Sequence, residues 1–417
     1  MIKKVQASEV RLGMYIHELR GNWLEHPFWR KSFKLAQQKD LDKLVSCDLD
    51  EIWIDTAKGL DVAPDETGLV ENLKPSNKIT PEIKIALDES PSPAPPSPPP
   101  SVKKPVARIS VEEELDNAKK IQKKTKDAVT SMFSDVRMGK ALEIEGAESL
   151  VEEINQSMER NPNALLTLIR LKNVNEYTYM HSVAVCMLMV ALGRQMGLDE
   201  AQIKQAGTAG LLHDIGKMVI PNEVLNKPGK LTDEEFAVMK SHPERGWEIL
   251  KSCYQVHETT LDVCLHHHER VDGKGYPEKL SGDALTLFAR MGAVCDVYDA
   301  ISSDRCYKPA WSPAESIRKM ASWKDGHFDE TIFQAFVKTI GIYPSGTLLK
   351  LKSGRLGVVM EQSTKKLTTP IVKTFFSTRA NAHIPVEILD LSKGTDGIES
   401  IEEPTKWGFD INKLQGI

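Results

Sequence analysis

Hydrophobic and polar positions near the start of the chain follow two different periods. "RLGMYIHEL" and "DEIWID" alternate between apolar and polar residues, which is typical of half-buried strands, and Ile52 and Ile54 fall on one side. Between these stretches, "FKLAQQKDLDKLVSC" has apolar residues at helical spacing. We therefore predict a small α+β domain over residues 1–62.

The pattern disappears over residues 63–109. "SPSPAPPSPPPSVKKP" is rich in proline and serine and has too few apolar residues to build a core. We predict a linker in this region, either disordered or in the polyproline II conformation.

Helical periodicity returns over residues 110–147. Ser110 and Glu113 have the spacing of a capping box, which marks the start of a helix. Apolar residues then recur near heptad spacing, with Gln122 as an interruption. The pattern predicts an amphipathic connector helix that packs on its neighbour. A coiled coil that forms a homodimer is the alternative.

The rest of the chain falls into two parts with different sequence patterns. Residues 148–342 predict almost continuous helices with short loops, and residues 343–417 predict short strands separated by glycine turns, as in "GTLLKLKSGRLGVVMEQ" and "PIVKTFFST". The predicted fold class is therefore mainly α. An all-helical middle block lies between the small α+β N-terminal domain and a short β-rich C-terminal appendage.

The composition is that of an ordinary globular protein. The 417 residues are 41% hydrophobic and 27% charged, and the formal net charge is −5, which argues against a nucleic-acid polymer as partner. The six cysteines form no CxxC pair, so neither a zinc ribbon nor a disulfide framework is indicated. The longest apolar run, which starts at Val183, is too short to span a bilayer. We expect a cytoplasmic protein without a membrane partner.

One polar pair interrupts an apolar helix pattern. His213 and Asp214 follow Leu211 and Leu212 within "AGLLHDIGKMVIP", where the spacing predicts one buried helix that runs on to Val219. Burying a charge without a partner costs free energy. A metal ion next to the pair would explain its position, but two residues cannot hold an ion alone.

Further candidate ligands are spread over the helical block. A single inward-facing histidine is usually a satisfied core residue, but several histidines with a carboxylate that can bridge are the ligands of a two-metal site, which hydrolyses phosphoesters. Helices of a bundle can converge on one such site from distant parts of the chain. The candidates are His181, His242, His266, His267, His268 and Asp296.

The chain resembles the HD-GYP family of bacterial cyclic di-GMP phosphodiesterases, within the HD superfamily of metal-dependent phosphohydrolases. His213–Asp214 in "HDIGK" match the HD pair, and Gly275–Pro277 in "HHERVDGKGYP" match the GYP motif. The stretches "YTYMHS", "IPNEVLNKPGKLTDEEF", "SHPERG" and "DVYDAISSDRCYK" are also similar to the family. The resemblance spans residues 155–340. Residues 1–62 resemble the domain of unknown function that precedes some HD-GYP domains.

The resemblance implies a set of metal ligands and two divalent ions per chain, iron or manganese. Asp214 would bridge the ions, and His266 would be a structural extra histidine. Some members use a glutamate, one turn before the first histidine, to hold a third ion. Tyr177 stands there, and Glu176 points about 100° away on a helix, so two ions are expected. The implied ligands are His181, His213, Asp214, His242, His267, His268 and Asp296.

The resemblance also implies how the substrate is held. Lys217, one turn beyond His213, would bind phosphate and take part in catalysis with Asp214, although a surface lysine is the alternative. Tyr276 would line the nucleotide pocket, although a purely structural turn is the alternative. The implied substrate-binding residues are Lys217, Arg305, Lys308, Asp272, Gly273 and Tyr276.

The expected reaction is metal-assisted hydrolysis of cyclic di-GMP to linear pGpG, with a second round to GMP. Other cyclic di-GMP signalling proteins could bind through the GYP loop, and the N-terminal domain would regulate by docking. Two alternatives are open: an HD phosphohydrolase for another nucleotide, such as ppGpp or a dNTP, and a non-catalytic sensor of cyclic di-GMP.

Overall fold

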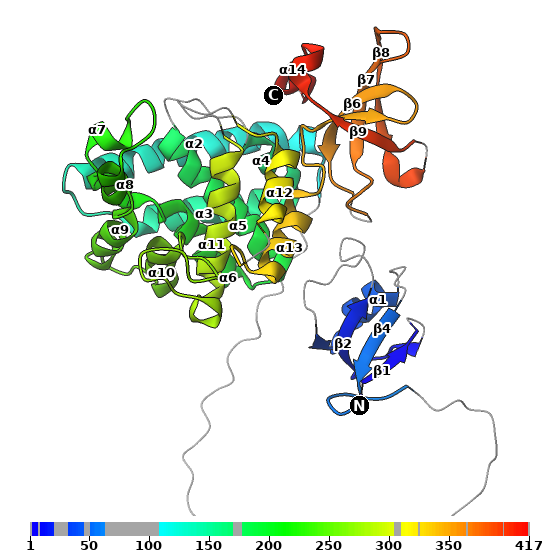
Figure 1. The fold of residues 1–417 in the computed structure, drawn as a ribbon, viewed down its shortest axis with the longest axis horizontal. Coiled ribbons are helices and arrows are strands. Elements are labelled where there is room, and N and C mark those ends of the chain that lie inside the picture. The colour runs from blue at the N-terminus through cyan, green and yellow to red at the C-terminus, as the bar shows by residue number, and fades with distance from the viewer. Residues whose placement is uncertain are drawn as a thin grey trace, which may run out of the picture.

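The computed structural model describes most of the chain (Figure 1). Helices dominate the middle and sheets lie at both ends, so the mainly α fold class is confirmed. Among the described residues, we find no helix with the length and apolar character that crossing a bilayer requires. The described residues are 2–6, 9–20, 32–45, 51–62, 108–169, 177–303, 310–323, 326–363, 366–394 and 396–415.

The N-terminal unit is an antiparallel sheet with one helix. Its strands β1 (Ile2–Val5), β2 (Tyr15–Arg20), β3 (Phe33–Lys34) and β4 (Glu51–Asp55) have the order β1-β4-β2-β3, and α1 spans Gln38–Val45. The two predicted strand segments form β2 and β4. The predicted helix was wrong at its start: Phe33 pairs with Ile16 in the sheet and its ring enters the core, which overrides the local helical spacing.

The predicted linker lies outside the described residues as far as residue 107. The helix α2 (Val111–Arg137) then begins with the expected capping box, in which Ser110 and Glu113 bond to each other's backbone N–H groups. It ends at Arg137, earlier than the predicted 147, and Gly139 follows with φ +75°.

Other helices of the same chain cover the buried face of α2. Residues such as Ala118 and Val129 pack against α3 (Ile144–Arg160), α4 (Pro162–Leu168) and α5 (Tyr177–Met196). Gln122, the interruption in the heptad pattern, donates a hydrogen bond from Nε2 to the carbonyl oxygen of Leu168 at 2.9 Å. This packing favours the amphipathic helix over the dimer-forming coiled coil.

One hydrophobic core extends through the helical block from Val111 to Ile340. α5 lies at its centre and is apolar on every side, because α2, α3, α4, α6, α11 and α13 pack around it. The expected boundary at residue 148 falls inside α3. The further elements are α6 (Glu200–Leu212), η3 (Ile215–Val219), α7 (Asn222–Leu225), α8 (Asp233–Met239), α9 (His242–Lys251), α10 (Glu258–His266), η4 (Gly282–Ala284), α11 (Leu287–Ile301), α12 (Pro313–Ser322) and α13 (Glu330–Ile340).

The C-terminal part forms a five-stranded antiparallel sheet of order β8-β7-β6-β5-β9. Thr167 of α4 and Ser345 share a hydrogen bond of 3.0 Å between their hydroxyl oxygens, which ties the segment before the sheet to the helical block. The elements are β5 (Leu348–Leu351), β6 (Arg355–Glu361), β7 (Ile371–Ser377), β8 (Ala382–Asp390), η5 (Leu391–Lys393), β9 (Ile398–Glu402), α14 (Pro404–Trp407) and α15 (Ile411–Gln415).

Candidate metal centre

The HD pair lies at a break between two helices. α6 ends at Leu212, His213 is its C-cap, and Asp214 is the N-cap of the 3-10 segment η3. The predicted continuous buried helix was therefore wrong, and Val219 is 48% exposed. Just after the break η3 approaches α9 backbone to backbone, because a Cβ on Gly216 would lie 1.9 Å from the carbonyl oxygen of His242.

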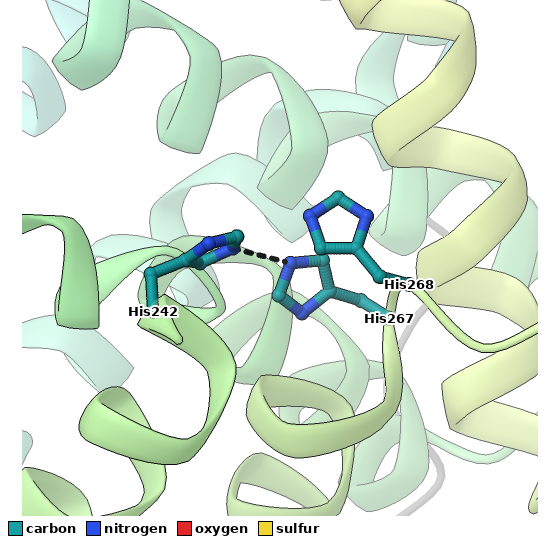
Figure 2. Close-up of side chains that lie close together, drawn as sticks. All are labelled: His242, His267 and His268. Atoms are coloured by element: carbon teal, nitrogen blue, oxygen red, sulfur yellow. Dashed lines mark hydrogen bonds between the residues drawn. The ribbon is translucent and has the colours of Figure 1, made fainter. Parts of the chain in front are cut away.

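The seven side chains that the resemblance implied as ligands lie together. Ligand atoms of His242, His267 and His268 lie within 4.8 Å of one another, as do those of His181, His213 and Asp296. Figure 2 shows the ring of His242, on α9, facing that of His267 at the end of α10, with the ring of His268 beside His267. Six of the seven side chains are buried, whereas His268 is partly exposed.

Asp214 lies between the two groups of ligands. Its Oδ2 atom is 3.4 Å from Nε2 of His181 and 3.4 Å from Nε2 of His213. Its Oδ1 atom is 3.3 Å from Nε2 of His242 and 3.8 Å from Nε2 of His267. Each carboxylate oxygen therefore faces a different pair of histidines, which is the arrangement of a bridging ligand.

Hydrogen bonds to the backbone orient three of the histidines. Since a carbonyl oxygen only accepts, each Nδ1 must carry the proton and each Nε2 presents a lone pair to the cluster. His213 donates to Gly210 O at 2.8 Å, His242 donates to Met239 O at 2.7 Å, and His267 donates to Val263 O and Cys264 O, both at 3.0 Å.

These tautomers leave lone pairs facing one another. Nε2 of His242 and Nε2 of His267 are 3.3 Å apart (Figure 2), yet neither carries a proton to share. Nε2 of His213 and Oδ1 of Asp214 are buried and have no hydrogen-bond partner among the residues that the structure describes. Such groups cost free energy unless a cation binds them. Imidazole nitrogens with carboxylate oxygens suit a divalent transition metal, so these residues fit the implied ions.

Electrostatics keeps Asp214, His267 and His268 in the forms that bind metal. Burial lowers the pKa of His268 to about 3. Burial, helped by the neighbouring histidines, holds the pKa of His267 well below its usual range. Burial alone would raise the pKa of Asp214, but Lys217 and His213 bring it well below the usual range. The carboxylate is therefore ionised and the two imidazoles are neutral at pH 7.

Sequence reasoning missed Asp299. Its side chain is fully buried on α11, and Oδ2 accepts a hydrogen bond from Nδ1 of His181 at 2.6 Å. A carboxylate in this position fixes the tautomer of a metal-binding histidine and raises its basicity. The signal was present in "DVYD", because Asp296 and Asp299 are one turn apart on the same helix face.

Lys217 lies at the edge of the cluster. Its Nζ donates to Oδ2 of Asp214, and its side chain is 18% exposed. The other two residues predicted to hold phosphate, Arg305 and Lys308, lie outside the described residues.

The GYP loop packs directly against the cluster. The ring of Tyr276 stacks on His268, with centroids 4.7 Å apart. Glu269, itself buried, holds the loop by accepting hydrogen bonds from the backbone N–H groups of Glu278 and Lys279 at 2.7 and 2.8 Å.

Two other residues predicted to bind substrate shape this loop. Asp272 accepts two hydrogen bonds from the guanidinium of Arg270, at 3.0 and 2.7 Å, so its carboxylate braces the turn. Gly273 has φ +72°, a conformation that a side chain would strain. Their contact with substrate stays a prediction.

Three residues were predicted not to bind metal. Nδ1 of His266 is 2.8 Å from Asp262, and its Nε2 is 3.3 Å from Glu278, outside the ligand groups. Tyr177 stacks on His181 with ring centroids 5.5 Å apart. Glu176 lies outside the described residues.

Comparisons with known proteins cover nearly the whole chain. A domain of unknown function, DUF3391, matches residues 2–147, which includes α2 as well as the predicted N-terminal domain, and the HD domain matches residues 158–332. The chain is 50% identical over 412 residues to the cyclic di-GMP phosphodiesterase PA4108 of Pseudomonas aeruginosa, which covers 98% of this chain and 94% of the relative.

Two further relatives match part of the chain. The cyclic di-GMP phosphodiesterase response regulator RpfG of Xanthomonas campestris is 37% identical over 206 residues, which are 48% of this chain and 53% of the relative. The 3'3'-cGAMP-specific phosphodiesterase 2 of Vibrio cholerae is 34% identical over 159 residues, which are 38% of this chain and 30% of the relative.

Proposed function

This chain belongs to the HD-GYP family of cyclic di-GMP phosphodiesterases, and we propose that it hydrolyses cyclic di-GMP at the cluster around Asp214. The observation that carries the proposal is the buried carboxylate of Asp214, whose two oxygens face two separate groups of histidines. A buried charge in this setting is stable only beside cations.

The HD domain binds divalent metal, and we propose two ions, iron or manganese. His181, His213 and Asp296 would hold one ion, while His242, His267 and His268 would hold the other. Asp214 would contact both through its separate oxygens. When bound, a pair of divalent ions supplies an activated water and neutralises charge on the phosphoryl group.

The protein's own residues would place the substrate and stabilise its charge. Lys217 has its ammonium at the edge of the cluster, so a small movement away from Asp214 would bring it to a phosphoryl oxygen. Tyr276 lies against His268 and would form a wall of the nucleotide pocket. Cleavage of one P–O3′ bond gives linear pGpG, and a second round at the other diester gives GMP.

Two alternative functions can be weighed against the same site. The similarity to a phosphodiesterase named as specific for 3'3'-cGAMP favours that dinucleotide as a second candidate substrate. The seven side chains implied as ligands lie together, which favours an enzyme over a non-catalytic sensor. Regulation by the N-terminal domain, docking of signalling proteins on the GYP loop, a homodimer and a cytoplasmic location stay predictions.

A hydrolysis assay tests the proposed function. The full-length chain, purified without oxygen and loaded with iron or manganese, should convert cyclic di-GMP to pGpG faster than it cleaves 3'3'-cGAMP, as measured by chromatography of the products. Binding of cyclic di-GMP without any turnover would identify a sensor. Faster cleavage of 3'3'-cGAMP would assign the second substrate.

The metal content is expected to be two ions per chain. Tyr177 offers a phenol, a poor ligand at neutral pH, where some relatives have a third carboxylate ligand. Elemental analysis of metal-loaded protein should therefore give a ratio near two. Tyr177→Glu should raise this ratio toward three, because a carboxylate would then lie one turn before His181. A third ion beside Tyr177 in the unaltered protein would contradict the prediction.

Asp299→Asn is expected to weaken metal binding. The amide oxygen of asparagine can still accept the hydrogen bond from His181 Nδ1, but it carries no negative charge. Loss of such a carboxylate typically lowers metal affinity by about 10- to 100-fold. Titration of the metal-free protein with Mn²⁺ measures the change. Asp262→Asn is the matched control, because Asp262 pairs with His266 outside the ligand groups. Equal affinities for both variants would show that Asp299 only supports the fold.

A further inference from the structure

The last residue of α2 contacts the segment that follows the HD pair. Nε of Arg137 donates to the carbonyl oxygen of Met218 at 3.3 Å, and Nη1 donates to Oδ1 of Asn222 at 2.6 Å. Met218 comes directly after Lys217. The guanidinium therefore connects α2 to the two residues on either side of the end of η3.

η3 has little of its own to hold this end in place. It is a short 3-10 segment, the side chain of Asp214 does not cap it, and Ile220 N–H bonds to Lys217 O at a long 3.3 Å. α7, which follows, has no buried residue. A cation that donates to the last carbonyl groups is a favourable cap for such a terminus.

Contacts on the opposite side fix the start of η3. Gly216 lies against the backbone of His242 and Gly246 in α9, so the first residues of η3 cannot move toward that helix. Arg137 holds the far end from α2. Lys217 lies between these two contacts along the chain.

A second contact links the same end of α2 to the ligand-bearing helix α5. Phe133, one turn before Arg137 and fully buried, packs edge-on against Tyr179 with ring centroids 6.0 Å apart. Tyr179 is two residues before His181. The last two turns of α2 thus contact η3, which carries Lys217, and α5, which carries His181.

We propose that Arg137 is a positioning residue for the reaction: it holds η3 so that Lys217 stays at the edge of the metal cluster, within reach of the substrate phosphate. Arg137 lies outside the HD match and inside the match to the domain of unknown function, so the N-terminal part of the chain supplies it. The expected loss of turnover on removing Arg137 rests on the proposed function. The expected loss of order in η3 does not.

The first experiment compares kinetics of four variants. Arg137→Ala should lower kcat about three- to tenfold with KM and metal content nearly unchanged, because small misplacements of a positioned group slow turnover. Arg137→Lys should restore part of the rate, since one donor can still reach Met218 O. Asn222→Ala removes one of the two acceptors and should have a smaller effect. Lys140→Ala is the control, because Lys140 lies near the same helix end and forms an ion pair with Asp135 of α2, away from η3.

A double-mutant cycle separates positioning from a general loss of stability. If Arg137 acts through Lys217, Arg137→Ala should slow the wild-type chain but have no further effect in a Lys217→Ala background. Equal effects on both backgrounds would overturn the proposal, as would a kcat for Arg137→Ala within the range of Lys140→Ala.

Hydrogen exchange gives a readout that does not depend on activity. In Arg137→Ala, amides of residues 217–220 should exchange faster, while those of α6 and α9 stay as in the wild type. If Arg137→Ala folds poorly, the same comparison is made with Asn222→Ala. If exchange at residues 217–220 is unchanged in the variant tested, Arg137 does not hold η3 in place. The proposal is then refuted, even if the wild type proves inactive toward cyclic di-GMP.

Discussion

Asp214→Ala is expected to abolish hydrolysis of cyclic di-GMP and to lower the metal content below one ion per chain. The carboxylate faces four histidine nitrogens, two through each oxygen, so its removal would take a ligand from both of the proposed ions. Loss of the metal contribution corresponds to several kcal/mol of barrier, a rate decrease of about 10³-fold or more. Product formation and elemental analysis on the same preparation measure both effects.

The loss should not come from unfolding. The residues around Asp214, such as Leu212 and Ile215, belong to the continuous core and keep their contacts in the variant. Asp262→Ala is the control, because it removes a carboxylate from a neighbouring histidine, His266, without touching the ligand groups. Measurable turnover at the wild-type rate by folded Asp214→Ala would refute the assignment of the site.

Gly216→Ala is expected to lower activity at least about 100-fold, the size of effect that a displacement near 1 Å produces. The new Cβ would lie 1.9 Å from His242 O and 2.5 Å from Gly246 N, and backbone atoms cannot yield as a flexible side chain could. η3 and α9 must therefore separate, which pulls Asp214 away from His242. We also expect a destabilisation of about 1–3 kcal/mol from overpacking. Turnover and thermal unfolding measure the two effects.

Gly146→Ala is the matched control for this substitution. Gly146 is an exposed glycine within α3, and a Cβ there would meet no atom within 4 Å. Alanine should be neutral or stabilising at this position, since it favours the helix. If both alanine variants keep wild-type activity, the close approach of η3 to α9 does not position the site.

The local sequence determined the features that depend on nearby residues. The capping box of Ser110 and Glu113 formed as predicted, because its hydrogen bonds join residues three positions apart. The first helix of the N-terminal unit was predicted to begin too early, because pairing of Phe33 with Ile16 is decided by a strand elsewhere in the chain. Similarly, nothing local to "LLHDIGKMV" announces the break after Leu212.

The sequence by itself determined the family and the activity that it implies. The order and type of its histidines and aspartates carried the resemblance to the HD-GYP family, and the comparisons confirm the family and its phosphodiesterase activity. The assignment of each residue as a ligand stays a prediction.

Only the tertiary structure decided how these side chains meet. The placement of Asp214 between two groups, the partner of each Nδ1 and the contribution of Asp299 all depend on how α5, α6, α9, α10 and α11 pack. His181 and Asp299 are 118 positions apart, and no periodic pattern sets the distance between them. The physical reason is that periodicity records which face of a helix is buried, whereas a metal centre is set by the relative positions of several buried faces.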